Sequence, residues 1–176
     1  MDVQRMIAYY EKNGHWLGSK DRPHRVLPYL SDCTSVLDVG CGEGQLLVEL
    51  LATEPRLDYT GIDCVPKHWA GACGRFPLAE FLLGDFLTYD FGNRRFDAVA
   101  AITLFSGDGW DRHDIIPAVA KMWWLAEKKI VIYYNAFREE FGHLAGIYGI
   151  VPVAHSEGDQ LLCLEKSSPA GAVGSP

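Results

Sequence analysis

Three acidic residues close short apolar stretches of the chain, and their types and spacing point to chemistry. Asp38 stands in VLDVG, Asp63 in YTGID and Asp85 in LLGDF. Aspartate is common at helix caps and in turns, so one such acid would carry little meaning. Acids at the ends of three successive apolar segments, beside a glycine-rich turn, indicate instead a binding site for a ligand with hydrogen-bond donors or positive charge.

The glycine turn follows Asp38, and its spacing limits the ligand. Gly40, Gly42 and Gly44 form G-x-G-x-G, whereas the dinucleotide-binding fingerprint places its third glycine one residue later. No G-K-[ST] follows either, so the turn is a poor phosphate cradle. An anion would also be repelled by Asp38 and Glu43. The turn therefore favours a ligand that carries positive charge and passes close to the backbone.

The second and third acids suggest what the rest of the ligand offers. Asp63 lies 19 residues beyond Gly44, where a carboxylate at a strand end can accept both hydroxyls of a ribose. Asp85 can accept from the amino group of an adenine, and the aromatic ring of Phe86 can cover the base.

The elements that must position these acids alternate along the chain. Expected strands cover 35–39, 57–62, 79–83, 96–103 and 129–134; expected helices cover 2–12, 26–30, 45–52, 67–73, 115–126 and 138–148; a final hairpin covers 150–155 and 160–165. This alternation predicts an α/β fold, a doubly wound and mostly parallel seven-stranded sheet with a C-terminal antiparallel hairpin. Ligands of such sheets bind at the carboxyl ends of the strands, where all three acids are expected.

The composition of the chain argues against some functions and suggests how the chain is divided into segments. The net charge of −7 argues against nucleic-acid binding, although the basic segment Lys20–Arg25 is either a solvated surface or a contact zone for an anionic substrate. The five cysteines are odd in number and never spaced C-x-x-C, so we expect reduced thiols in a cytoplasmic protein and no metal site. Neither a signal peptide nor a membrane span is expected. We divide the chain into a helical cap (1–33), a cofactor-binding core (34–166) and a disordered tail (167–176) rich in Ser, Pro, Ala and Gly.

The motifs VLDVGCGEG, YTGID and LLGDF together resemble those of the class I S-adenosylmethionine-dependent methyltransferases, over roughly residues 34–165. The resemblance implies that S-adenosylmethionine is the cofactor, with Asp38 and the glycine turn at its methionine part. It implies that Asp63 holds the ribose and that Asp85 with Phe86 holds the adenine. The full set of cofactor-binding residues expected on this basis is Asp38, Gly40, Cys41, Gly42, Gly44, Asp63, Cys64, Asp85, Phe86 and Thr103.

The loop TLFSGDGWDRHD follows the fourth expected strand and faces the methyl acceptor in this family. His113 is the natural general base, with an ordinary pKa near ~6.5, but it could equally be a first-turn helix residue that faces water. Asp108 and Asp111 could act instead, or could bind a cationic substrate. A base is needed only if the acceptor arrives protonated. Trp110 could line the pocket or simply anchor the loop.

Two sequence motifs that the chain lacks narrow the range of possible methyl acceptors. The loop has T-L-F-S instead of [DN]-P-P-[YFW], and Asn135 stands where ribose 2′-hydroxyl methyltransferases carry a lysine, so a nucleic-acid substrate is disfavoured. The chain is also short for the family, which leaves the site open unless N-terminal residues (Tyr9, Tyr10, His15 and Trp16) or a second subunit, as in a homodimer, cover it. We expect O- or N-methylation of a small-molecule metabolite. The alternatives are an RNA or protein methyltransferase, and a non-catalytic protein that binds the cofactor as a sensor or partner.

Overall fold

The structure is a computed structural model that describes residues 2–13, 21–53, 56–102, 104–105, 110–148, 153–156 and 159–166. Its helices are α1 (Val3–Asn13), α2 (Asp21–Val26), α3 (Gln45–Thr53), α4 (Pro66–Arg75), α5 (Arg112–Leu125) and α6 (Arg138–Tyr148), with a 3₁₀ turn at Leu27–Tyr29. Its strands are β1 (Ser35–Val39), β2 (Asp58–Asp63), β3 (Glu80–Leu83), β4 (Phe96–Ile102), β5 (Ala126–Tyr134), β6 (Val153–Ser156) and β7 (Asp159–Glu165).

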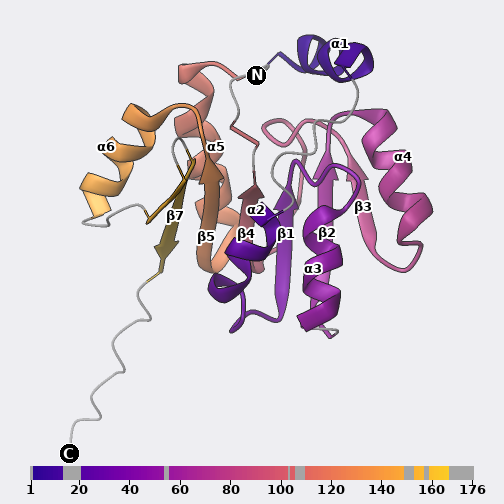
Figure 1. Ribbon diagram of the computed structural model, residues 1–176, viewed down its shortest axis with the longest axis horizontal. Helices are drawn as coiled ribbons and strands as arrows, with labels where there is room; N and C mark the ends of the chain where they lie inside the picture. Colours follow the sequence, from indigo (N-terminus) through magenta and orange to yellow (C-terminus); the bar gives the residue numbers. More distant parts are fainter. Residues whose placement is uncertain are drawn as a thin grey trace, which may run out of the picture.

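The strands form one sheet in the order β3-β2-β1-β4-β5-β7-β6 (Figure 1). All pairs from β3 to β5 are parallel, whereas β7 pairs antiparallel with both β5 and β6. The predicted fold, a doubly wound and mostly parallel sheet with a C-terminal hairpin, is therefore confirmed. The chain order reverses between β1 and β4, and ligands of such sheets bind at this switch point.

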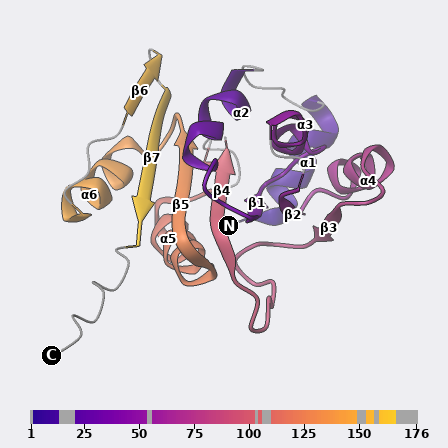
Figure 2. The same cartoon turned by 90° about the horizontal axis from the view of Figure 1, so that it is seen from below.

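Helices cover both faces of the sheet, with α5 and α6 on one side and α2 and α3 on the other (Figure 2). Successive residues of a strand point to opposite faces. In β1, accordingly, Val36 packs into the cluster under α3 and Leu37 into the cluster under α5. The two central strands are thus buried on both sides, which explains the continuous apolar run of β4.

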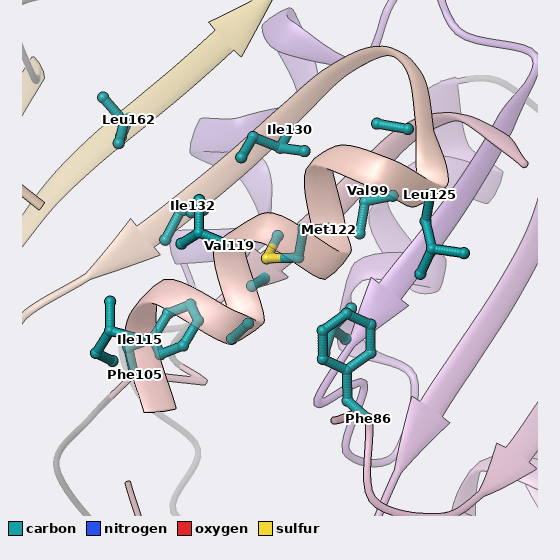
Figure 3. Packing of buried hydrophobic residues seen from close by; sticks show 14 of the residues in the cluster. Phe86, Val99, Phe105, Ile115, Val119, Met122, Leu125, Ile130, Ile132 and Leu162 are labelled. Atoms are coloured by element: carbon teal, nitrogen blue, oxygen red, sulfur yellow. The ribbon is translucent and has the colours of Figure 1, made fainter. Parts of the chain in front are cut away.

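The hydrophobic core beneath α5 fixes the position of this helix on the sheet. Ile115, Val119, Met122 and Leu125 recur at helical spacing and pack against side chains of β4 and β5 (Figure 3). Full burial of each such side chain contributes about 1.5–3 kcal/mol. This packing places the start of α5 at the carboxyl edge of the sheet.

Two local predictions are wrong. Helical spacing in the sequence predicts a buried face of Leu46, Leu47, Leu50 and Leu51 for α3, but Leu51 is 48% exposed, because the other three already fill the stripe that faces the sheet. From its place in the middle of the expected helix 115–126, Trp124 is predicted to lie mainly in the core, but it is 49% exposed, with the Arg95 guanidinium 3.4 Å from the centre of its ring. No helix in the described part of the chain is long and apolar enough to cross a membrane.

Candidate active site

The glycine turn joins β1 to α3 and has a backbone that other residues rarely adopt. Gly40, Gly42 and Gly44 have φ values of 73°, 56° and 82°, in the left-handed region that favours glycine. The turn is tied to β2, because the amides of Gly40 and Cys41 donate to the carbonyl of Ile62 at 2.8 and 3.1 Å. The carboxyl end of β1 is therefore covered by bare backbone, as the sequence predicted.

Cys41, an expected cofactor residue, points its side chain away from the outer surface of this turn. Its thiol is buried against β2, where a Cβ on Gly61 would lie 2.8 Å from the sulfur. Burial, with the charges of Asp38 and Asp63, raises the pKa of the thiol well above its ordinary value. The side chain of Cys41 therefore packs inside the fold.

Asp38 is a buried carboxylate, only 3% exposed. The hydroxyl of Tyr59 donates to its Oδ2 at 2.8 Å, and among the described residues no cation pairs with it. Burial raises the pKa of Asp38 to about 7, against the opposing hydrogen bond from Tyr59 and with a further increase from Asp63. A buried carboxylate without a cation is costly. The site is therefore suited to a ligand that brings positive charge.

Asp63 closes β2 and links it to the glycine turn. Its Oδ2 accepts from the amide of Gly42 at 2.9 Å, and its Oδ1 accepts from the amide of Val65 at 2.8 Å. A carboxylate offers about four acceptor positions, so capacity for ligand hydroxyls is left. The buried His68 of α4 lies with its Nδ1 3.7 Å from Oδ1 of Asp63.

Asp85 and Phe86 follow β3 but take different positions. Asp85 is partly buried at the edge of the sheet, and its Oδ1 accepts from the amide of Leu87 at 2.9 Å. The ring of Phe86 is 4% exposed and packs in the core, 6.0 Å from the ring of Phe91 (Figure 3). In this position the ring is part of the core beneath the segment that follows β3. It would have to leave the core to cover a base.

Helix α1 lies across the carboxyl ends of the strands (Figure 1). The ring of Tyr10 packs edge-on against His68 at 4.8 Å, and the thiol of Cys64 donates to the sulfur of Met6 at 3.4 Å. The helix thus contacts the residues beside Asp63, which is the place expected for a lid. His15 and Trp16, predicted to share this role, lie outside the described residues.

Of the three candidates for general base, two lie in the described part of the chain, and both are exposed. Asp108, the third, and Thr103, an expected cofactor-binding residue, lie outside the described residues. Asp111 is the exposed N-cap of α5, and its amide donates to the Asp114 carboxylate at 3.0 Å. His113 is exposed in the first turn of the same helix. A catalytic role for any of these residues stays a prediction.

Sequence reasoning missed Tyr59 and His68. Tyr59 lies on the same face of the sheet as Asp38 because β1 and β2 pair in parallel with Asp38 opposite Gly61. That register is set by tertiary structure. His68 had a weaker signal, a histidine five residues after the second acid and in the first turns of a helix.

Comparison with known proteins decides the family. The methyltransferase domain family matches residues 36–125, which is more than half of the chain. The chain belongs to the methyltransferase domain family. This methyltransferase has the class I fold of S-adenosylmethionine-dependent methyltransferases. No curated protein matches its sequence. Among its described residues, no three His, Cys, Asp or Glu side chains are grouped to hold a metal ion.

Solved structures similar to this methyltransferase come from several bacteria. Magnesium protoporphyrin IX methyltransferase (ChlM) from Synechocystis PCC 6803, with bound S-adenosylmethionine, is 13% identical, with a TM-score of 0.73 over 95% of this chain and 98% of its own. The N-methyltransferase NodS from Bradyrhizobium japonicum WM9, with S-adenosylhomocysteine, is 16% identical, with a TM-score of 0.70 over 93% and 100%. CalS10, an amino pentose methyltransferase from Micromonospora echinaspora with bound S-adenosylmethionine, is 28% identical, with a TM-score of 0.53 over 73% and 53%.

Proposed function

We propose that this methyltransferase transfers the methyl group of S-adenosylmethionine to an oxygen or nitrogen atom of a small-molecule metabolite by in-line displacement. The observation that carries the proposal is Asp38, a buried carboxylate beside a glycine turn with no cation paired to it among the described residues. S-adenosylmethionine bears an ammonium, a sulfonium and ribose hydroxyls, which match this site. The names of similar structures, such as the mitomycin 7-O-methyltransferase MmcR, support a small acceptor.

Each part of the site has an assigned role in this proposal. Asp38 and the turn Gly40–Gly44 would hold the methionine part, Asp63 the ribose and Asp85 the adenine. The cofactor supplies an electrophilic methyl group on sulfur. The chain binds and aligns the two reactants and excludes water, which together account for most of the catalysis expected in such a displacement.

A macromolecular acceptor is less well supported. The net charge of −7 would repel a nucleic acid. Two members of the basic segment also face inward, because Arg22 is 7% exposed and Arg25 donates to the hydroxyl of Tyr133 at 3.3 Å. Nδ1 of His24 lies 3.6 Å from the carboxylate of Glu49 in α3, but the His24 side chain is 74% exposed. The two arginines serve the packing of α2 more than an RNA surface.

The test combines binding with transfer. Calorimetry with S-adenosylhomocysteine should show binding that Asp38→Asn weakens. Incubation with methyl-labelled cofactor and cell extract should then place the label in the small-molecule fraction. Absence of binding would refute the proposal, and label found only in RNA or protein would transfer it to the macromolecular alternative. Binding without any transfer would indicate a sensor or a non-catalytic partner.

We also propose a cytoplasmic location and a second copy or partner subunit over the open site. The five cysteines are free thiols, as in a reducing compartment. Burial raises the pKa of the Cys33 and Cys64 thiols to about 12, which keeps them unreactive. Fractionation of cells tests the location, and light scattering with and without S-adenosylhomocysteine tests the assembly.

A further inference from the structure

Beside the carboxyl ends of β4 and β5, four buried polar atoms make no hydrogen bond to the described part of the chain. They are Nε1 of Trp110, the hydroxyl of Tyr134, Oδ1 of Asn135 and Oε2 of Glu140. Tyr134 is fully buried and Trp110 is 3% exposed. An unpaired buried polar atom costs about 1–3 kcal/mol. We therefore expect these four atoms to find their partners in a ligand or in ordered water.

A chain of aromatic rings connects Trp110 to Tyr134. The ring of Trp110 lies 4.8 Å from that of Phe105, Phe105 lies 5.1 Å from Phe141, and Phe141 lies 4.4 Å from Tyr134. Asn135 directly follows Tyr134 at the end of β5. The cluster thus joins Trp110, just before α5, to the end of β5 and to the start of α6.

Glu140 belongs to the same cluster through α5. Its Oε1 pairs with Nε of Arg112 at 2.9 Å, two residues after Trp110. Its Oε2 is the oxygen without a partner. One half of this carboxylate is therefore fixed by the chain, and the other half is held in place for a donor from elsewhere.

The cluster lies next to the glycine turn but is separate from the three acids of the cofactor site. A Cβ on Gly40 would lie 2.6 Å from Cδ1 of Leu104, the residue before Phe105. The cluster and the glycine turn therefore lie next to each other, on either side of the switch point between β1 and β4. A reactant bound at the cluster would lie on the opposite side of this switch point from the acids on β2 and β3.

The pattern of donors and acceptors selects a chemical class. Oδ1 of Asn135 and Oε2 of Glu140 can only accept, Nε1 of Trp110 can only donate, and the Tyr134 hydroxyl can do either. A carboxylate oxygen accepts most strongly from an amine or ammonium N–H. We propose that Trp110, Tyr134, Asn135 and Glu140 recognise the methyl acceptor, and that this acceptor is a small amine with a nearby oxygen that accepts from Trp110.

The inference rests on the proposed function and makes the transfer an N-methylation. The amine reacts as its free base, and its lone pair forms the new N–C bond. The electron pair of the breaking C–S bond stays on sulfur, so the products are an N-methylammonium ion and S-adenosylhomocysteine. Charge and atoms balance without an additional reactant.

The first test is a panel of matched compounds with methyl-labelled cofactor. Small amines that carry a nearby hydroxyl or carbonyl are paired with counterparts in which oxygen replaces the nitrogen. N-methyl products, at least ten-fold preferred over their counterparts, support the inference. Transfer only to the oxygen compounds, or no transfer to any amine by protein that binds S-adenosylhomocysteine, overturns it. Loss of S-adenosylhomocysteine binding would instead contradict the proposed function.

The second test uses variants with a readout independent of turnover. Tyr134→Phe should raise the melting temperature by about 2–4 °C, because it removes a buried hydroxyl without a partner, and should lower kcat/KM for the amine about ten-fold. Glu140→Gln should lower kcat/KM by about ten- to a hundred-fold. Glu139→Gln is the matched control, because Glu139 also pairs with Arg112 but is exposed. A destabilised Tyr134→Phe protein, or equal losses for Glu139→Gln and Glu140→Gln, would overturn the inference.

Discussion

The amide of Gly42 donates to the carboxylate of Asp63 at 2.9 Å, so the glycine turn and the acid of the second strand form one unit. A ligand that binds one of them meets the other already in position. This preorganisation lowers the entropic cost of binding. It also means that a change at Asp63 acts both on ligand contacts and on the turn.

We therefore expect Asp63→Ala to weaken binding of S-adenosylhomocysteine by about 1–3 kcal/mol, because hydroxyls of the bound ribose lose their acceptor. Calorimetry measures the effect. Asp58→Ala is the control, since Asp58 begins the same strand and is exposed. Wild-type affinity in Asp63→Ala would remove this residue from the cofactor site.

Asp38 makes stability depend on pH. Its pKa rises from an ordinary value of 3.8 to about 7 in the folded protein, so the folded state holds a proton that the unfolded state has lost. The contribution of this group to stability therefore falls as the pH rises from about 4 to about 7. Between pH 5 and pH 8, the free energy of unfolding of Asp38→Asn, measured with urea, should increase relative to that of wild type by about 1–3 kcal/mol. An equal difference between the two proteins at both pH values would contradict this.

The same carboxylate predicts proton release when a cationic ligand binds. An ammonium beside Asp38 favours its charged form and lowers its pKa. At pH 7 the free protein should release up to about half a proton per S-adenosylhomocysteine bound. Titrations in two buffers of different ionisation enthalpy measure this quantity. No release in wild type, or the same release in Asp38→Asn, would place the ligand's ammonium elsewhere.

Gly44 should not tolerate a side chain. Its φ is +82°, and an added Cβ would lie 2.8 Å from Cε2 of Phe76. We expect Gly44→Ala to lower the free energy of unfolding by about 1–3 kcal/mol. Gly74→Ala is a matched control on α4, where no atom lies within 4 Å of the new Cβ, and it should stabilise the helix by about 0.5–1 kcal/mol. Similar effects of both changes would argue against the strained turn.

His113→Ala tests the exposed candidate for general base. If His113 removes the proton of the acceptor, turnover should fall by about a hundred-fold or more, while the affinity for S-adenosylhomocysteine stays at its wild-type value. His143→Ala, a change at an exposed residue of α6, serves as the control. Unchanged turnover in His113→Ala would make this histidine a surface residue only.

The sequence was sufficient to predict the fold and the position of the three acids. The glycine turn, the buried run of β4 and the acid at the end of β2 depend on local patterns, which short segments carry by themselves. The contact between Tyr59 and Asp38 depends on strand register, which local patterns do not fix. The core position of Phe86 was missed because an aromatic residue after a strand can face either the ligand or the core.

The cluster around Tyr134 could not be predicted from the sequence. Its residues are separated by up to 30 positions, from Trp110 to Glu140, and only the packing of α5 and α6 on the sheet brings them together. Moreover, each residue alone has an ordinary explanation. Their unpaired atoms become informative only when hydrogen bonds are counted in three dimensions.

The strand order has a consequence for how this enzyme could be re-engineered. The acids on β1, β2 and β3 precede residue 90, whereas the Tyr134 cluster is built entirely after residue 100. In our proposal, the donor and acceptor sites therefore occupy consecutive parts of the chain, which meet where β1 pairs with β4. A chimera that exchanges everything beyond the exposed connection at Gly92 should adopt a new acceptor and keep its methyl donor.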